Sequence, residues 1–376
     1  MPTDPSPTAL GSWSGGRFMH FGEPLGDDRL TALLRPGDGI DTVITADVYG
    51  QGEADRVVGR ALQGTDRDAY CLVGAVGHDF YTGERAGAKG FPRFTATQPP
   101  ERWGTYLREA AERSLERCGV DAFDLLLLHN PDRAGYSDPR VWEGMQELRS
   151  AGLTRLLGVA PGPANGFTLD LIDCLERFGD VIDWQMIILS PMEPWPGELV
   201  LGAAATHGVR TITRVADYGG LFWGDVRPGH AFRERDHRLF RPSGWIEAGV
   251  EKLDRMRPIG ERHGLTLMQL ACQWNLAHET VSCVAPTLIQ EAGDGARPIE
   301  SKRAELAALP HDVLLEPGEV DELRAIGDNT GSMHLKGAAV DHEGEPQPDR
   351  WPLDAQLEEV AERWRIDPAR DLIKTG

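Results

Sequence analysis

The feature that most constrains the fold of this chain is an eightfold alternation of short apolar runs with amphipathic helical segments. Strands of a parallel sheet are covered on both faces, so they read as continuous apolar runs, and helices connect them. Eight such units fit a closed (β/α)8 TIM barrel, which usually takes about 250 residues plus insertions. We expect strands near Arg17–Phe21, Thr42–Ala46, Tyr70–Gly74, Phe123–His129, Leu156–Ala160, Ile182–Ile188, Arg210–Arg214 and Val281–Ala285.

The barrel leaves segments at both ends of the 376-residue chain. Residues 1–15 are rich in Pro, Ser and Gly, which predicts a disordered N-terminus, and residues 16–330 form the barrel. Residues 331–376 are expected to form a C-terminal extension with one amphipathic helix, at Asp354–Arg365. This helix is expected either to fold over the barrel mouth or to dock on the outside.

Charge and composition limit the classes of molecule that this chain is expected to bind. The net charge of -20 disfavours nucleic acid and anionic lipid, because both repel an anionic surface. No stretch approaches the roughly 18 apolar residues of a membrane span, and the N-terminus lacks the pattern of a signal peptide. The five cysteines form no CxxC pair and no zinc-ligand spacing. We expect a cytoplasmic protein with reduced thiols and a small-molecule substrate.

Three motifs resemble signatures of the aldo-keto reductases, and the resemblance extends over roughly residues 15 to 330. They are TADVYGQGEADRVVGRAL (Thr45–Leu62), LLLLHNPD (Leu125–Asp132) and GLTLMQLACQWNLA (Gly264–Ala277). The resemblance implies a TIM barrel with its active site at the carboxyl ends of the strands. It also implies transfer of a hydride between NADP(H) and a small carbonyl or sugar-like substrate.

The family's reaction uses an Asp, a Tyr, a Lys and a His, and this chain keeps half of that set. Tyr49 and His129 match the pattern, whereas Ile44 and Ala75 stand at the Asp and Lys positions. In the family the Tyr exchanges a proton with the substrate oxygen and the His orients that oxygen. A nearby ammonium favours the phenolate form of a Tyr, and losing it makes the Tyr a weaker acid. His129 therefore becomes the stronger candidate for proton transfer near neutral pH.

The loss of both partners is consistent with a stable barrel. Removing one member of a buried ion pair costs about 3–5 kcal/mol, whereas replacing both by apolar groups is often neutral.

The expected cofactor contacts also differ from the family pattern. The family's fifth strand commonly ends GVSN, and here Ala160 and Pro161 replace the Ser and Asn that hold the nicotinamide amide. The remaining candidates are a glutamine of strand six, a glycine-rich loop suited to a pyrophosphate, and basic residues suited to the adenosine phosphate. These cofactor-binding candidates are Gln185, Gly219, Gly220, Leu221, Arg297, Lys302 and Arg303.

Other polar and aromatic residues follow strand ends and are candidates for substrate binding. Arg214 is expected to clamp an oxyanion or carboxylate, and His20 to form an acid–base pair with His129. Tyr218 is the nearest counterpart of the aromatic residue that stacks on the nicotinamide. No ligand spacing supports a metal site. The substrate-binding candidates are His20, Asp47, His78, Arg214, Asp217, Tyr218 and Trp223.

Three functions agree with these residues. The first is oxidoreduction by an aldo-keto-reductase-like enzyme with an incomplete catalytic set. The second is a lyase, dehydratase or epimerase reaction in which His129 and Tyr49 move protons without redox chemistry. The third is a non-catalytic binding subunit. Binding of NADP(H) separates the first from the second.

Overall fold

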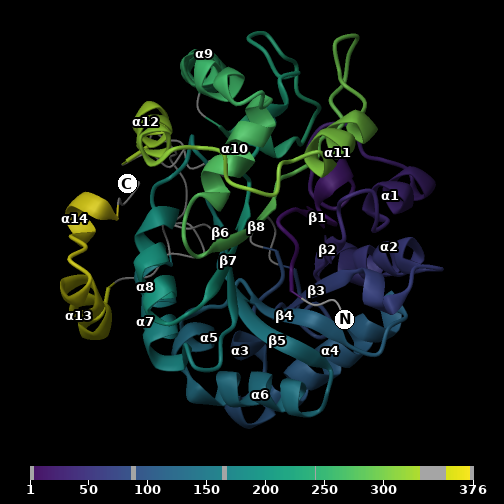
Figure 1. Ribbon diagram of the computed structural model, residues 1–376. Helices are drawn as coiled ribbons and strands as arrows, with labels where there is room; N and C mark the ends of the chain where they lie inside the picture. The colour runs from purple at the N-terminus through teal and green to yellow at the C-terminus, as the bar shows by residue number, and fades with distance from the viewer. Residues whose placement is uncertain (1–3, 86–89, 163–166, 242, 331–352, 373–376) are drawn as a thin grey trace.

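A parallel sheet closed into a barrel forms the centre of the molecule (Figure 1). The computed structural model describes residues 4–85, 90–162, 167–241, 243–330 and 353–372. A parallel bridge between Thr8 and Val284 joins the first and last strands, so the predicted TIM barrel is confirmed. In sheet order the strands are β1 (Ala9–Gly11), β2 (Thr42–Ile44), β3 (Cys71–Val76), β4 (Phe123–His129), β5 (Thr154–Ala160), β6 (Trp184–Ile188), β7 (Arg210–Arg214) and β8 (Val281–Ala285).

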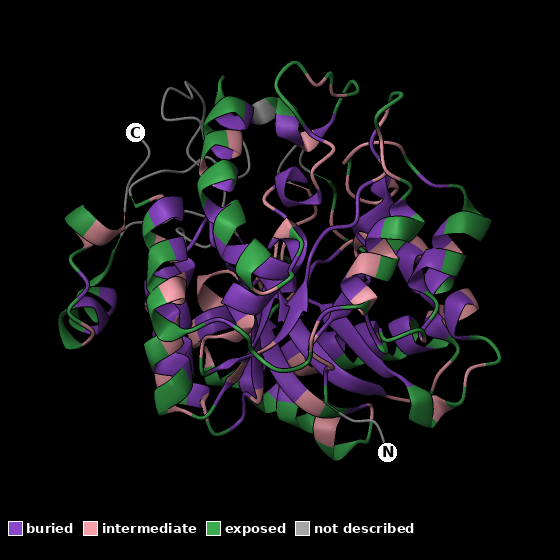
Figure 2. Cartoon of the chain, turned by 45° about the horizontal axis from the view of Figure 1, so that its top comes forward, coloured by how far each residue is buried: buried purple, intermediate pink, exposed green. Residues whose placement is uncertain are grey.

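Helices surround this barrel, and Figure 2 shows their exposed outer faces around the buried strands. None of the helices in the described ranges is long and apolar enough to cross a membrane. Those that follow strands within the barrel are α1 (Asp27–Leu34), α2 (Glu53–Leu62), α3 (Phe94–Thr97), α4 (Trp103–Cys118), α5 (Arg133–Ser137), α6 (Pro139–Ser150), α7 (Thr168–Phe178), α8 (Leu201–Thr206), α9 (Trp245–Arg262), α10 (Leu267–Leu276) and α11 (Ile299–Ala307). The later helices are α12 (Pro317–Gly327), α13 (Ala355–Arg363) and α14 (Pro368–Asp371).

Side chains along each strand point alternately into the barrel and toward the helices. Along β3, Val73 and Ala75 belong to the cluster inside the barrel, whereas Leu72 and Val76 pack with the outer core. Ile44 on β2 lies in the same inner cluster. The two positions that carry Asp and Lys in the family pattern therefore contribute apolar side chains to the interior.

The first strand corrects the sequence prediction. β1 comprises Ala9–Gly11, within the segment predicted to be disordered, and all three residues are buried. Residues 17–21, predicted as the first strand, form bends at 17–19 and no regular element at 20–21, and His20 is exposed. The strand was missed because it is short and has no β-branched residue. Pairing with β2 and closure against β8 hold it in place.

The helix predicted in the C-terminal extension is present as α13, and α14 follows it. Asp354 caps α13 by accepting a hydrogen bond from the Leu357 amide at 2.9 Å. The helix docks on the outside of the barrel against α7 (Figure 1), where Gln356 donates to Asp173 at 2.9 Å and the Trp364 indole donates to Glu176 at 2.8 Å. Most of the remaining extension, residues 331–352 and 373–376, lies outside the described residues.

Candidate functional site

The site lies at the mouth of the barrel, where the carboxyl ends of the strands meet. By the alternation of side chains, Ala75, His129, Ala160 and Arg214 all point inward at the ends of β3, β4, β5 and β7. Tyr49 follows β2 on a 3-10 turn, Tyr49–Gly52, and packs against the inner cluster. Four strands thus direct side chains, among them an imidazole and a guanidinium, toward the same end of the barrel interior.

Tyr49 and His129, the two retained residues of the family pattern, meet at this mouth. Their ring centroids lie 5.7 Å apart with the rings edge to face. His129 is buried, and its ring also lies 5.1 Å from that of His78. The predicted catalytic candidates are therefore neighbours in a row of three rings.

His78 is held neutral by its surroundings. Burial lowers the pKa of His78 to about 4, and the positive charge of Arg93 adds to this effect. Its Nδ1 lies 3.0 Å from the carbonyl oxygen of Phe91, and its Nε2 lies 3.2 Å from the side-chain amide nitrogen of Asn130. A neutral imidazole with its proton on Nδ1 satisfies both contacts, because Nε2 then accepts from Asn130. His78 thus fixes the wall beside His129.

Arg214 brings a positive charge to the mouth from β7. Its Nη2 donates to the carbonyl oxygens of Pro161 and Gly162, at 2.9 and 3.2 Å. Burial lowers the pKa of Arg214, and the opposing influences on it come from Tyr49, Tyr136 and Glu193. Burial raises the pKa of Tyr49, and the charge of Arg214 opposes that rise. A cation therefore lies near Tyr49, supplied by β7 instead of the family's lysine position on β3.

Two residues that the sequence analysis did not select as site residues complete the group. Glu193 follows β6 and Arg241 lies in the long segment after β7, and both side chains are buried. Burial raises the pKa of Glu193 to about 8, Arg241 and Arg214 oppose the rise, and Asp217 adds to it. Neither residue belongs to a recognisable motif, so only the fold brings them to the mouth. We call Tyr49, His78, His129, Glu193, Arg214 and Arg241 the mouth cluster.

Strained backbone borders the mouth cluster. Asn130, directly after His129, has φ 47°, and Val215, directly after Arg214, has φ 62°. A β-branched residue with positive φ is a rare and costly conformation. Such strain is found preferentially at functional sites, because the surrounding structure must hold it in place. Both bends follow inward-pointing side chains of the mouth cluster.

Two predicted substrate-binding residues point elsewhere. The ring of His20 lies 5.5 Å from that of His237, on an exposed loop, so His20 forms its ring contact there instead of pairing with His129. Asp47 is fully buried, and burial together with the negative charge of Asp55 raises its pKa well above the usual range. Arg117 of α4 opposes that rise, so the charges nearest Asp47 belong to the helical layer.

In the loop after β7, backbone and side-chain groups are hydrogen-bonded within the loop and to its neighbours. The carboxylate of Asp217 accepts from the amides of Thr287 and Gly220, at 2.8 and 2.9 Å. The amides of Trp223 and Gly224 donate to carbonyls within the loop, and the Trp223 indole donates to Thr287 at 2.8 Å. Asp217 and Trp223 therefore stabilise the loop, and these amides are not directed toward a pyrophosphate. Gly219 and Leu221 lie on the same loop, and Leu221 is buried.

Tyr218 and Gln185 likewise have structural partners. The Tyr218 ring lies 4.6 Å from the guanidinium of Arg241, so it supports that residue. Gln185 alternates with the inward-pointing Trp184 and Met186, and its Nε2 donates to Thr211 at 3.0 Å. Alternation thus directs Gln185 toward the helical layer instead of the mouth.

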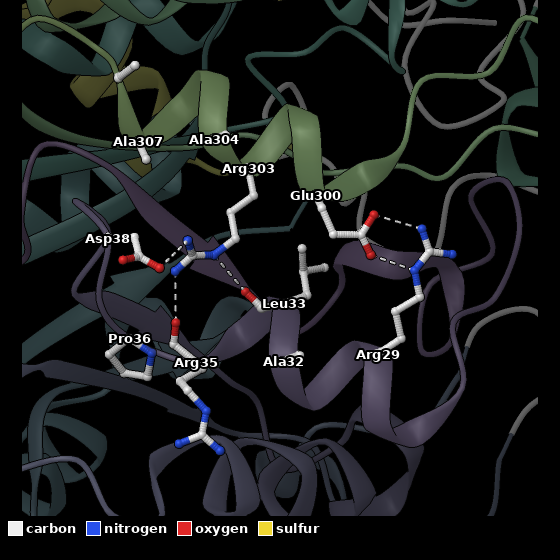
Figure 3. A pocket seen from close by; sticks show the side chains of 11 residues that line it. Arg29, Ala32, Leu33, Arg35, Pro36, Asp38, Glu300, Arg303, Ala304 and Ala307 are labelled. Carbon is white, nitrogen blue, oxygen red and sulfur yellow. Dashed lines mark hydrogen bonds and ion pairs between the residues drawn. The ribbon is translucent and has the colours of Figure 1, made fainter.

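The three basic cofactor candidates are bound internally. Lys302 of α11 is buried, and its Nζ lies 2.6 Å from Asp225 and 2.6 Å from the carbonyl oxygen of Ile289. Arg297 pairs with Glu305 at 2.5 Å. Arg303 donates to the carbonyl oxygens of Leu33, Arg35 and Gly37, and Figure 3 shows the first two of these contacts along one wall of a pocket between α1 and α11.

We call Asp225, Arg297, Lys302, Arg303 and Glu305 the α11 cluster. With its cations bound internally, and with Ala160 and Pro161 unable to donate side-chain hydrogen bonds, the residues present do not fit NADP(H) in the family's manner. Within the described ranges, no group of three or more His, Cys, Asp or Glu side chains is placed to hold a metal ion.

Known proteins share this fold and parts of this sequence. A probable voltage-gated potassium channel β subunit from rice is 22% identical, over 83% of this chain and 92% of its own length. An aldo-keto reductase from Bacillus subtilis is 25% identical, over 71% and 76% of the two chains.

Solved structures agree on the fold. A glycerol dehydrogenase from Gluconobacter oxydans superposes with a TM-score of 0.64 at 23% identity, covering 87% of this chain and 92% of the other. An aldo/keto reductase from Klebsiella pneumoniae, solved in complex with NADP and acetate, gives 0.56 at 21% identity, covering 87% and 94%. The model of the Aldo/keto reductase family matches residues 30–292. The chain therefore belongs to the aldo/keto reductase family.

Proposed function

We propose that the chain is an enzyme of its family's class, an oxidoreductase that acts at the carbonyl or alcohol oxygen of a small polar molecule in the barrel mouth. One observation carries the proposal. Tyr49 and His129 lie 5.7 Å apart at the mouth, and the charge of Arg214 acts on Tyr49. An acid–base pair and a cation around one space are what a reaction at a polarised oxygen requires.

Each residue of the site has a separate role in this reaction. Because burial raises the pKa of Tyr49, it remains a phenol near neutral pH and donates a hydrogen bond to the substrate oxygen. Arg214 stabilises negative charge that develops on that oxygen, in a buried site where electrostatic interactions are strong. His129 moves the proton, since histidine is the side chain that titrates most readily near neutrality. His78, neutral and hydrogen-bonded on both nitrogens, keeps the His129 ring in position.

NADP(H) is the redox partner that family membership suggests. The α11 cluster does not offer its cations to an adenosine phosphate, so we assign no residue of this chain to that part of the cofactor. The same observation favours a second candidate function. In a lyase, dehydratase or epimerase, the same His129, Tyr49 and Arg214 act on a carbonyl-containing molecule without a redox partner.

Titration with NADPH and NADP+, by calorimetry and fluorescence, separates the two functions. The oxidoreductase proposal requires binding at about micromolar strength, worth about -8 kcal/mol. It also requires turnover of an aldehyde, ketone or polyol that falls at least about 100-fold in His129→Asn, because general acid–base groups contribute at least that factor. His207→Asn, a change at the end of α8, is the matched control and keeps activity.

Absence of binding at millimolar cofactor contradicts the oxidoreductase. His129-dependent conversion without a change in redox state then establishes the second candidate.

A further inference from the structure

Two arginines reach the mouth with hydrogen-bonding capacity left over. Arg214 uses Nη2 on the carbonyl oxygens of Pro161 and Gly162, while its buried Nε has no acceptor among the described residues. Arg241 is 9% exposed, and its Nη1 is also buried without an acceptor in that part of the chain. A buried N–H group without a partner costs free energy, so these donors indicate a ligand.

The position of Arg241 is fixed before any ligand arrives. Its guanidinium lies 4.6 Å from the centre of the Tyr218 ring and 4.4 Å from that of Trp245. Trp245 in turn stacks on Phe232, with ring centroids 6.0 Å apart. Cation–π contacts of this kind orient a guanidinium without using its N–H donors. Arg241 also forms a side-chain hydrogen bond with Tyr218, so the side chain is held in place while its Nη1 remains available.

The local charges leave the two arginines without full compensation. Glu193 faces both of them, and its Oε2 is buried without a donor among the described residues. Because burial raises the pKa of Glu193 to about 8, this carboxyl is largely protonated at neutral pH. Asp217 also faces this group, but its carboxylate accepts from the amides of Thr287 and Gly220. A half-buried cation, Arg214, and a buried one, Arg241, with this little compensation favour an anionic ligand.

We propose that the mouth binds a substrate that carries a carboxylate group, with Arg214 and Arg241 as its ligands and Glu193 as a neighbouring hydrogen-bond donor. The inference rests on the proposed function, because it places the substrate's reacting oxygen with Tyr49 and His129. A carboxylate matches the planar fork of a guanidinium, which binds two oxygens at once. A hydroxy or oxo acid brings both an anionic group and a reactive oxygen.

The test is a calorimetric titration of the full chain at pH 7 with two acids and their neutral amides: lactate with lactamide, and gluconate with gluconamide. At least one acid should bind tenfold or more tightly than its amide, and Arg214→Gln and Arg241→Gln should each weaken that binding at least tenfold. Arg210→Gln, at the opposite end of β7 and paired with Asp4 on the surface, should leave it unchanged. Circular dichroism and thermal unfolding confirm that each variant folds.

The pH dependence of ligand affinity provides a second test, which needs no arginine variant. Glu193 is faced by Arg241, Arg214, Asp217 and Tyr218, and above pH 8 it ionises and competes with the ligand for the two arginines. Affinity for the acid should therefore fall between pH 7 and 9 in the wild type. It should remain constant in Glu193→Gln, which cannot ionise.

Equal affinity for acid and amide, or failure of both acids to bind at millimolar concentration, overturns the inference. Tighter binding of inorganic phosphate than of either acid overturns it in favour of a phosphorylated substrate. The proposed function fails separately. If an acid binds through the arginines but NADPH does not bind, the carboxylate proposal stands and the oxidoreductase proposal fails. If neutral carbonyls are reduced with no preference for acids, the oxidoreductase proposal stands and the carboxylate proposal fails.

Discussion

The mouth cluster and the α11 cluster both contain buried cations, but they differ in whether the N–H donors of those cations have protein acceptors. Lys302 has an acceptor on Asp225 and another on the Ile289 carbonyl, each at 2.6 Å. Arg214 and Arg241 each keep one buried donor nitrogen without an acceptor among the described residues. A buried cation whose donors reach protein acceptors rigidifies a fold, whereas a buried donor without an acceptor is costly unless a ligand supplies one. The contrast separates scaffold from site within one barrel.

Arg238 shows how complete the saturation becomes outside the mouth. It forms paired contacts with Asp236 and with Glu291, at 2.5 to 3.0 Å. Asp236 also accepts from the Gly22 amide at 2.8 Å, so the network ties together the loops that follow β1, β7 and β8. Buried arginines are thus not sites in themselves, and it is the unfilled donors that distinguish Arg214.

The largest expected effect concerns Lys302. Replacing it by Met leaves Asp225 buried without its partner, so we expect the free energy of unfolding to fall by about 3–5 kcal/mol. Lys302→Met combined with Asp225→Leu should recover much of the loss, and Arg235→Met at an exposed position should change little. Urea unfolding measures all three. A stable Lys302→Met with lost NADPH affinity would show that Lys302 is a cofactor residue.

A second variant adds a cation to the mouth itself. Ala75→Lys places an ammonium in the inner cluster, against which Tyr49 packs, and should cost about 3 kcal/mol because the family's Asp partner is replaced by Ile44. Ile44→Asp added to it restores the family's pair and should regain part of that stability. If NADPH binds, the double variant should also reduce carbonyls faster. Thermal unfolding and NADPH oxidation check this, and additive losses would exclude pairing.

His78, which lies beside His129 in the mouth cluster, makes the free energy of unfolding depend on pH. The folded-state pKa of His78 is lowered to about 4, whereas an unfolded histidine titrates near 6.5. The unfolded chain therefore binds a proton first as pH falls. The stabilising contribution is present above pH 6.5 and is lost toward pH 4, amounting to at most about 3 kcal/mol. Urea unfolding of wild type and His78→Gln from pH 7 to 4.5 should converge at low pH, and parallel curves would contradict this.

The smallest effect is expected on the outside of the barrel. Arg363 of α13 pairs with Glu176 of α7 at 2.5 Å, and half of its side chain is exposed. Exposed ion pairs contribute little, so Arg363→Ala should lower the stability by less than about 1 kcal/mol and leave ligand binding unchanged. A loss of activity in this variant would place the extension in the function of the mouth instead of on the scaffold.

The sequence predicted most of the fold because its signals are local. In the helix before β4, Leu107, Ala110 and Leu115 have the apolar spacing of an amphipathic helix, and α4 buries that face and ends at Gly119 with φ 70°. By contrast, β1 is stabilised by its neighbours instead of by its own composition. Its three residues carry no strand signal, and closure of the barrel determines where the strand lies.

The site was predicted less completely because contacts, not motifs, decide it. Tyr49 and His129 lie in local motifs that match the family pattern, and both lie at the mouth. Glu193 and Arg241 lie in segments without a motif, so sequence spacing gave no reason to join them. Lys302 and Arg303 have the residue type of a phosphate site, but their partners Asp225 and Leu33 are distant in sequence and become visible only in the fold.

Arginine side-chain NMR tests most directly whether Arg214 keeps an open donor at the mouth while Arg238 and Arg303 donate to neighbours within the described part of the chain. The Nε–H groups of Arg214, Arg238 and Arg303 would be followed during titration with the acid that binds, each assigned by its Lys variant. The account predicts that Arg214 shifts, while Arg238 and Arg303, which already donate to Asp236 and to the Leu33 carbonyl, stay unchanged. Shifts at Arg303 or Arg238 with none at Arg214 would contradict it.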